Sequence, residues 1–337
     1  MSSTSSDTAA DPSPSSTGTG AGTDSLRDVA VFLVIAFALP WLLWVGEQVT
    51  GVRILFLAAP LAVAIATFVA VRWVRRPASI PRATALVPVR PAGRLLRYCL
   101  LAAGIFLVLP AITVALNAGT GTYPVDLRGF SALRHHYAPE TMGQTGIPWG
   151  VVAQALAVNL AQFVLILPVM FCEEWGWRGY LLNRLRDRLG TWPALITIGL
   201  LCGPWHLPFF LGPWFSMGAD GRQTVIPFTI FCALFGVLLG LLRLAGGSIW
   251  PAVVAHAVNN TLATGFVQVV VADNDAEINA WRTGLSGWQG WLILLAAIAI
   301  LAATGVVRRA DRDRRADRDR PAPALGVAGS ADVGGAR

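Results

Sequence analysis

The stretch that decides the fold is "WGVVAQALAVNLAQFVLILPVMFCEEWGWR", residues 149–178. Residues 149–172 are predominantly apolar and long enough to cross a membrane as a helix, which requires about 17–25 such residues. The run ends in Glu173 and Glu174, and Arg178 follows four residues after the second glutamate. A charge at the centre of a membrane helix costs roughly 2.5–3.5 kcal/mol, so these charges predict a functional role.

The composition of the whole chain indicates an integral membrane protein. Of its 337 residues, 55% are hydrophobic and 13% are charged, whereas a soluble domain has about 25% charged residues. We therefore predict an all-α fold: a polytopic membrane helical bundle of about eight transmembrane helices, embedded in a lipid bilayer and without a nucleic acid partner. The expected spans are residues 29–46, 54–71, 98–118, 149–172, 192–211, 225–242, 248–272 and 288–307.

The arginines predict how the chain is oriented. The connection 72–97 contains seven arginines and no acidic residue, and basic residues also follow the fourth, sixth and eighth spans. The intervening connections are neutral or acidic. Because positive charge is enriched in cytoplasmic loops, we predict a multi-pass protein of the cell membrane with both termini in the cytoplasm.

The bundle is expected to occupy residues 26–307, between two polar tails. Residues 1–25 are rich in Ser, Thr and Gly and lack the basic start of a signal peptide, so they are predicted to be disordered. Residues 308–337 begin with an Arg/Asp-rich block and are predicted to be a disordered cytoplasmic tail. The four cysteines lie in or beside apolar segments, which indicates buried thiols and no disulfides.

Three polar clusters lie within the predicted spans. Glu174 and Arg178 are four residues apart and can form an ion pair, while Glu173 is turned about 100° away and can face a cavity. The second cluster is "GPWHLPFF", in which His206 lies between two prolines that disturb helical hydrogen bonding. The third is "AHAVNN", in which His256 and Asn260 share a helix face.

Each cluster alone also has a purely structural explanation. The charges could end a span, a lone histidine is often a satisfied core residue, and polar pairs hydrogen-bond between membrane helices. Their depth along the spans, at 1.5 Å per residue, favours a common site. We therefore expect Glu173, His206, His256 and Asn260 to meet around one cavity that is reached from the cytoplasm.

The three motifs together resemble those of a known protein family. "EEWGWR", "WHLP" and "HAVNN" are similar, in order and spacing, to the motifs of the intramembrane CAAX-protease and bacteriocin-processing proteins, which include the Rce1-like type II prenyl proteases. The resemblance covers about residues 149–272, the expected catalytic core. One departure is Cys202, because the family usually has an aromatic residue four positions before the histidine. Because of this departure, the resemblance does not predict the shape of the pocket around His206.

The resemblance implies an intramembrane endopeptidase that acts on a membrane-associated peptide or protein. In this family pattern, Glu173 is the general base that activates water, and His206 helps to position that water. His256 and Asn260 donate hydrogen bonds to the oxyanion, and Glu174 and Arg178 support the site.

A zinc site is the alternative that the same residues allow. Glu173, His206 and His256 are residue types that can ligate zinc. The chain has no H-E-x-x-H motif, and an asparagine four residues after His256 suits hydrogen-bond donation better than zinc ligation. We therefore favour a mechanism without a metal or other cofactor.

Two further function classes are compatible with this sequence. The fold could belong to a non-catalytic protein for bacteriocin self-immunity or peptide binding. A transporter or proton relay also uses buried carboxylates and histidines, but it favours internal repeats and sites at the bilayer midplane. No clear repeat is present. The substrate and the oligomeric state are not predicted.

Overall fold

The computed structural model describes residues 24–87, 91–211, 221–275 and 279–318. Within these ranges every regular element is a helix, apart from a single bridge between Val125 and Ala272. The elements are α1 (Asp24–Thr50), α2 (Ile54–Ala58), α3 (Leu61–Val69), the π-helix η1 (Ala70–Arg75), α4 (Ile80–Ala83), α5 (Ala92–Gly119), α6 (Ser131–Tyr137), the 3₁₀ turn η2 (Pro139–Thr141), α7 (Trp149–Glu174), the π-helix η3 (Trp175–Leu181), α8 (Leu182–Leu189), α9 (Thr191–Trp205), α10 (Leu207–Leu211), α11 (Gly221–Gly246), α12 (Trp250–Val258), the π-helix η4 (Asn259–Val267), α13 (Gln268–Val271), α14 (Trp288–Ala303) and α15 (Val306–Arg318).

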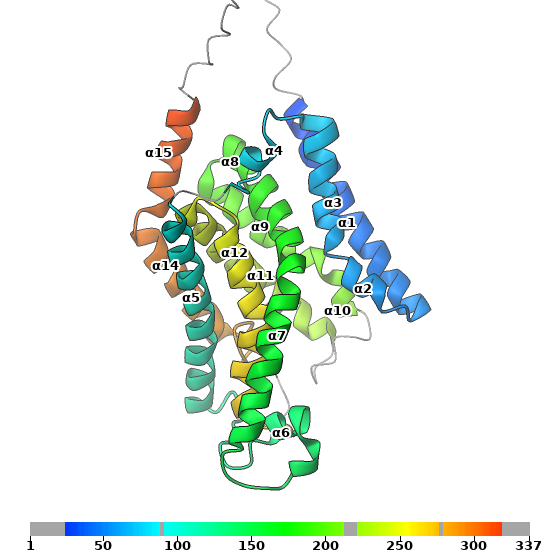
Figure 1. Cartoon of the computed structure of the whole chain (residues 1–337), viewed down its shortest axis with the longest axis vertical. Coiled ribbons are helices and arrows are strands. Elements are labelled where there is room, and N and C mark those ends of the chain that lie inside the picture. Colours follow the sequence, from blue (N-terminus) through cyan, green and yellow to red (C-terminus); the bar gives the residue numbers. More distant parts are fainter. Residues whose placement is uncertain (1–23, 88–90, 212–220, 276–278, 319–337) are drawn as a thin grey trace, which may run out of the picture.

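The spans confirm the predicted polytopic bundle. In the described part of the chain, seven helical segments are long and apolar enough to cross a membrane, and the pair α14–α15, bent by 50°, makes up to eight. Helices satisfy their own backbone hydrogen bonds, which is the condition for crossing lipid. Helix α1 begins and α15 ends at the same end of the bundle, as an even number of spans requires (Figure 1).

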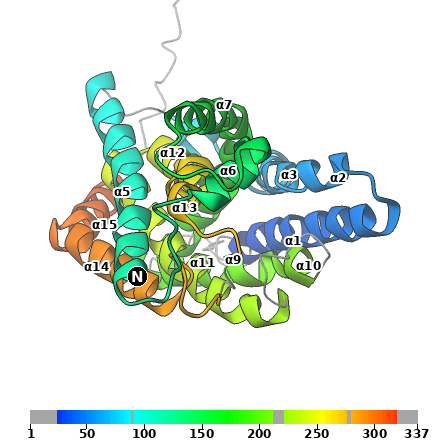
Figure 2. The ribbon, with the colours of Figure 1, turned by 90° about the horizontal axis from the view of Figure 1, so that it is seen from below.

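The central helices pack closely because glycines line their contact. Seen from below, α11 and α12 lie between the α1–α3 pair on one side and α5 with α14 on the other (Figure 2). Helix α9 carries Gly199 and Gly203, and α11 carries Gly236 and Gly240, a small-residue spacing typical of tight membrane helix pairs. A Cβ atom at Gly199 would lie 2.5 Å from the carbonyl oxygen of Ala233. The two backbones therefore touch where these glycines meet.

The fourth span continues beyond its predicted end at residue 172. Helices α7, η3 and α8 form one helical segment, residues 149–189. Gly176 and Gly179 make this possible, because Cβ atoms there would collide with Val63 of α3 and with the backbone oxygen of Thr84. The charged motif therefore lies within a continuous helical segment, and the side chains of Glu173, Glu174 and Arg178 are buried.

The predicted disorder from residue 308 onward is wrong for residues 308–318, which form most of α15. This helix is held by its acidic side chain Asp311, which accepts a hydrogen bond from Thr191 Oγ1 at 2.5 Å and lies 3.6 Å from Arg186. Composition alone does not reveal these contacts with α8 and α9. Helix α1 begins at Asp24, and the other residues of the two predicted tails, 1–23 and 319–337, lie outside the described residues.

The connection between α5 and α7 is organised by one carboxylate, that of Asp126. It accepts hydrogen bonds from the backbone N–H groups of Arg128, Gly129 and Ser131 at 3.1, 2.6 and 3.0 Å. These bonds, that from Gly129 above all, lower the pKa of Asp126. Helix α6 follows directly, and its neighbouring histidines at 135 and 136 are exposed, as predicted.

We expect Gly199→Ala to lower the free energy of unfolding by about 1–3 kcal/mol, the usual effect of overpacking. The added methyl group meets backbone and not a flexible side chain. Thermal unfolding in detergent measures the change. Gly104→Ala is the matched control, because a Cβ atom there meets nothing within 4 Å. Equal melting temperatures for the two variants would contradict the tight contact between α9 and α11.

We expect Asp126→Asn to loosen the connection before α7 at neutral pH but not in acid. The pKa of Asp126 is lower in the folded protein, so its contribution is fully present above its unfolded pKa and disappears as the pH falls through the folded value. Hydrogen exchange of the Gly129 and Ser131 amides measures this effect. If the difference in amide exchange between variant and parent is the same at neutral and at acidic pH, the prediction is contradicted.

Candidate active site

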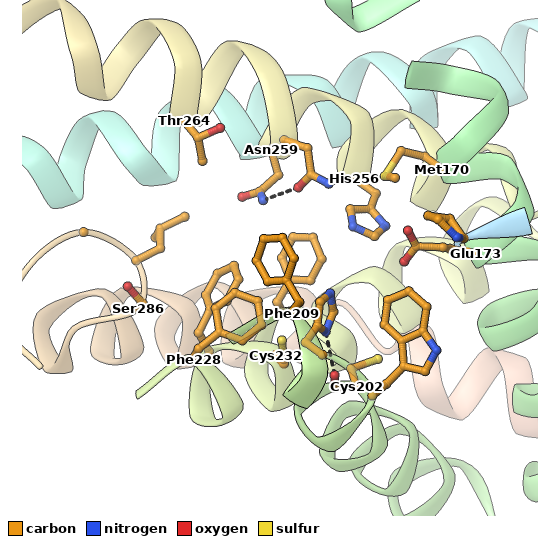
Figure 3. A pocket seen from close by; sticks show the side chains of 18 of the residues that line it. Met170, Glu173, Cys202, Phe209, Phe228, Cys232, His256, Asn259, Thr264 and Ser286 are labelled. Carbon is orange, nitrogen blue, oxygen red and sulfur yellow. Dashed lines mark hydrogen bonds between the residues drawn. The ribbon is translucent and has the colours of Figure 1, made fainter. Parts of the chain in front are cut away.

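A cavity of about 560 Å³ lies inside the bundle, and the four predicted catalytic side chains line it. They are Glu173 from α7, His206 from the break after α9, His256 from α12 and Asn260 from η4. The side chain of Glu173 lies at one end of the cavity and points toward His256 (Figure 3). Residues from three distant parts of the sequence are thus brought together, as the motifs predicted.

The two adjacent glutamates face different surroundings. Glu173 is buried and lines the cavity, whereas Glu174 is fully buried and does not line it. Glu174 Oε1 accepts a hydrogen bond from Arg178 Nη1 at 2.7 Å, which confirms the predicted pair. The same oxygen lies 2.9 Å from His256 Nδ1. This second contact was not predicted, because it joins helices that are far apart in sequence.

The contact with Glu174 orients the ring of His256. A carboxylate can only accept hydrogen bonds, so Nδ1 carries a proton and donates it to Glu174. The opposite nitrogen, Nε2, is then left for the cavity that His256 lines. Phe235 packs against the ring in an edge-to-face contact with centroids 5.2 Å apart. Nε2 accepts a hydrogen bond when the imidazole is neutral and donates one when it is protonated.

His206 lies where the fifth span breaks. Its backbone N–H bonds to Gly203 and not to the carbonyl of Cys202, and its own Nδ1 donates to that carbonyl at 2.7 Å. When the ring is neutral, Nε2 is therefore the nitrogen that carries the lone pair. Two more carbonyls of the break, those of Trp205 and Pro208, accept hydrogen bonds from Trp41 and Gln48 of α1 at 3.0 and 2.8 Å.

Aromatic side chains from other helices enclose His206. Trp44 of α1 stacks on the ring at 6.2 Å, and Phe228 of α11 contacts its edge at 5.1 Å. Cys202 lies below in the cavity wall and is buried. The aromatic contacts of His206 named here therefore come from α1 and α11, and position 202 contributes a thiol to the cavity wall.

Asn260 is joined to a second asparagine in the cavity wall. Asn259 Nδ2 donates to Asn260 Oδ1 at 3.0 Å, and Asn260 Nδ2 lies 3.4 Å from Met170 Sδ. The helix changes from α to π at Asn259, a distortion that is frequent at functional sites. The sequence analysis singled out Asn260 and not Asn259, which lines the cavity as well.

The cavity extends in the direction opposite to that expected. From Glu173 its lining continues to Gln268, Tyr123 and Ser286, which lie at the end of the bundle away from the arginine-rich connections. At the arginine-rich end, residues 80–86 cover the helices. Ala85 O there accepts hydrogen bonds from Ile249 N and Ser248 Oγ at 3.1 and 3.2 Å.

The zinc alternative finds no ligand group in the described part of the chain. No three or more His, Cys, Asp or Glu side chains there are arranged to hold a metal ion. Glu173, His206 and His256 share the cavity without forming such a group. Both Nδ1 atoms are directed at protein acceptors, an arrangement that histidines ligating zinc through Nε2 also have, so it does not distinguish the two alternatives.

Comparison with known proteins agrees with this geometry. Residues 153–262 match the model of a family described as type II CAAX prenyl endopeptidase Rce1-like, and no curated protein matches the chain. The matched segment contains all three motifs. This match to an Rce1-like model confirms the resemblance drawn from the motifs.

We expect Arg178→Met to lower the free energy of unfolding by about 3–5 kcal/mol, because it leaves the buried Glu174 charge without its cation. Unfolding in detergent measures the loss. Arg128→Met is the control, since the Arg128 side chain is exposed and such changes usually stay within about 0.5 kcal/mol. A loss below about 1 kcal/mol at Arg178 would show that the pair is not needed to hold the charge.

Proposed function

We propose that this chain is an intramembrane endopeptidase that hydrolyses a peptide bond of a membrane-associated peptide or protein. The Rce1-like domain supports the class of reaction. The observation that carries the proposal is the shared cavity, which brings a buried carboxylate, a histidine acceptor and an amide donor together within the bundle.

Glu173 and His206 would activate the attacking water. Both side chains present acceptors to the cavity, so a single water molecule can donate one hydrogen to Glu173 and its second hydrogen to His206 Nε2. A lone pair of the water oxygen is then left to attack the substrate carbonyl. As the new C–O bond forms, a proton passes to Glu173 and the carbonyl oxygen becomes an oxyanion. When the C–N bond breaks, that proton passes to the leaving amine.

His256 and Asn260 would stabilise the oxyanion. Asn260 Nδ2 has only a thioether sulfur as its partner, so it can turn its donor to a developing charge. Protonated His256 donates from Nε2, and Glu174 holds the ring for this role. Removing one such donor typically costs about 2.7–4 kcal/mol in the transition state. Glu174, which does not line the cavity, is then a positioning residue, and Arg178, which does line it, holds Glu174 in place.

We further propose that the protein resides in the cell membrane with both termini in the cytoplasm. The arginine-rich connections and both ends of the described chain lie at the same end of the bundle. Cytoplasmic positive charge favours this orientation. No metal or other cofactor takes part in the proposed steps.

We expect Glu173→Gln to abolish peptide cleavage, with a loss of about 10²–10⁴-fold from removing the base. Gln keeps the shape and hydrogen bonding of the side chain. Comparative peptidomics of membranes that contain the parent protein or the variant measures the cleaved peptides and identifies the substrate. Glu140→Gln is the control, because Glu140 is exposed in η2, outside the cavity.

Two outcomes would contradict this assignment. Identical peptides from the parent and Glu173→Gln would favour the non-catalytic reading, a bacteriocin self-immunity or peptide-binding protein. Cleavage that a chelator abolishes and zinc restores would show that Glu173, His206 and His256 act as metal ligands and not through the metal-free route.

A further inference from the structure

The cavity continues well beyond the four catalytic side chains. Its lining includes a row of polar side chains from η4 and α13, which we call the polar row: Asn259, Asn260, Thr264 and Gln268. The facing wall is apolar and consists of phenylalanines from α10 and α11: Phe209, Phe228, Phe231 and Phe235. Figure 3 shows Asn259 and Thr264 on one side of the cavity, with Phe228 and Phe209 across from them.

Asn259 presents a hydrogen-bond acceptor that has no partner in the protein. The residue is 5% exposed, and its Oδ1 is buried and without a hydrogen bond, while its Nδ2 is occupied by Asn260. A buried acceptor without a partner costs about 1–3 kcal/mol. The adjacent Asn260 offers a donor whose partner is a weak acceptor, the sulfur of Met170. Together the two carboxamides present one acceptor and one donor.

A peptide backbone is the occupant that fits both walls. Each peptide unit supplies one N–H donor and one carbonyl acceptor, the complement of the two asparagines. In an extended segment, successive side chains point to opposite faces, so apolar ones can reach the phenylalanines. A lipid chain would fill the apolar wall but has no donor for Asn259 Oδ1. Asn260 and Thr264 are exposed although both lie within a span, so these two members of the row are accessible from the cavity, and Asn259 is buried beside them.

We propose that the polar row binds the backbone of an extended, apolar segment of the substrate. Given the proposed function, this segment runs from the scissile bond at Glu173 toward Tyr123 and Ser286. That direction leads away from the arginine-rich end of the bundle and across the interior of the membrane. The substrate class is therefore a peptide or protein whose membrane-embedded apolar segment is bound, with Asn259 and Thr264 as residues that bind its backbone.

Photo-crosslinking tests this path directly. The photoreactive amino acid p-benzoylphenylalanine is placed at Ser286, at the far end of the cavity, in the full chain carrying Glu173→Gln. Membranes of the native cells are irradiated, and the adducts are identified by mass spectrometry. We expect peptide adducts at position 286 and only lipid adducts at Ile300, a control position that is 71% exposed on α14. Only lipid adducts, or none, at position 286 would overturn the proposal.

A second measurement tests the polar row itself. We expect Asn259→Leu to lower the yield of peptide adducts about fivefold to tenfold, which corresponds to the loss of one hydrogen bond. Thr113→Val is the control and should leave the yield unchanged, because Thr113 is buried in α5 outside the cavity and its hydroxyl donates to the carbonyl of Leu109 in the same helix. If Asn259→Leu does not fold, Thr264→Val at its exposed position should give the same loss. An unchanged yield in the folded variants would overturn the role of the row.

The two proposals fail in different ways. If peptide adducts form at position 286 but the parent protein cleaves no peptide, the proposed binding of the substrate is supported and the proposed hydrolysis is contradicted. If the parent protein cleaves peptides but no peptide adducts form at position 286, the proposed hydrolysis is supported and the proposed path of the substrate is contradicted.

Discussion

The site depends on one buried carboxylate oxygen, Oε1 of Glu174, which contacts both Arg178 and His256. A buried charge is tolerated in a bundle only when it is paired and hydrogen-bonded. Because Glu174 contacts Arg178 of η3 and His256 of α12, it joins these two elements. The adjacent Glu173 then faces the cavity. Arg178 is in turn confined by the contact between α9 and α11, because a Cβ atom on Gly236 would lie 3.2 Å from its Nη2. The glycine contact and the ion pair therefore support each other.

Both histidines of the site are oriented by the same means. Each uses Nδ1 as a donor, His256 to the Glu174 carboxylate and His206 to the carbonyl of Cys202. In the second case the ring replaces a helical hydrogen bond lost at the break of the fifth span. Irregular backbone persists within a membrane only where its polar groups find such partners. The break and the orientation of His206 are thus one feature, and Trp41 and Gln48 of α1 complete it.

The cavity combines two chemical environments along its length. Its polar side is part of a π-helix, η4, and its apolar side consists of phenylalanines on two other helices. A purely apolar channel would suit a lipid chain, and a purely polar one would admit water through the bundle. The combination suits a peptide, whose backbone is polar and whose side chains can be apolar. At the arginine-rich end, Ala85 O accepts hydrogen bonds from Ile249 N and Ser248 Oγ, and no residue of the segment 80–86 lines the cavity.

The sequence by itself determined the helical class, the approximate spans, the Glu174–Arg178 pair and the four residues that line the cavity. These follow from local properties: apolar segment length, helical periodicity, proline positions and motif spacing. Only the tertiary structure decided the Glu174–His256 contact, the place of Asn259 in the cavity wall, the direction of that cavity and the helix at residues 308–318. Each of these depends on contacts between segments far apart in the chain, and hydropathy and periodicity describe a segment without its neighbours.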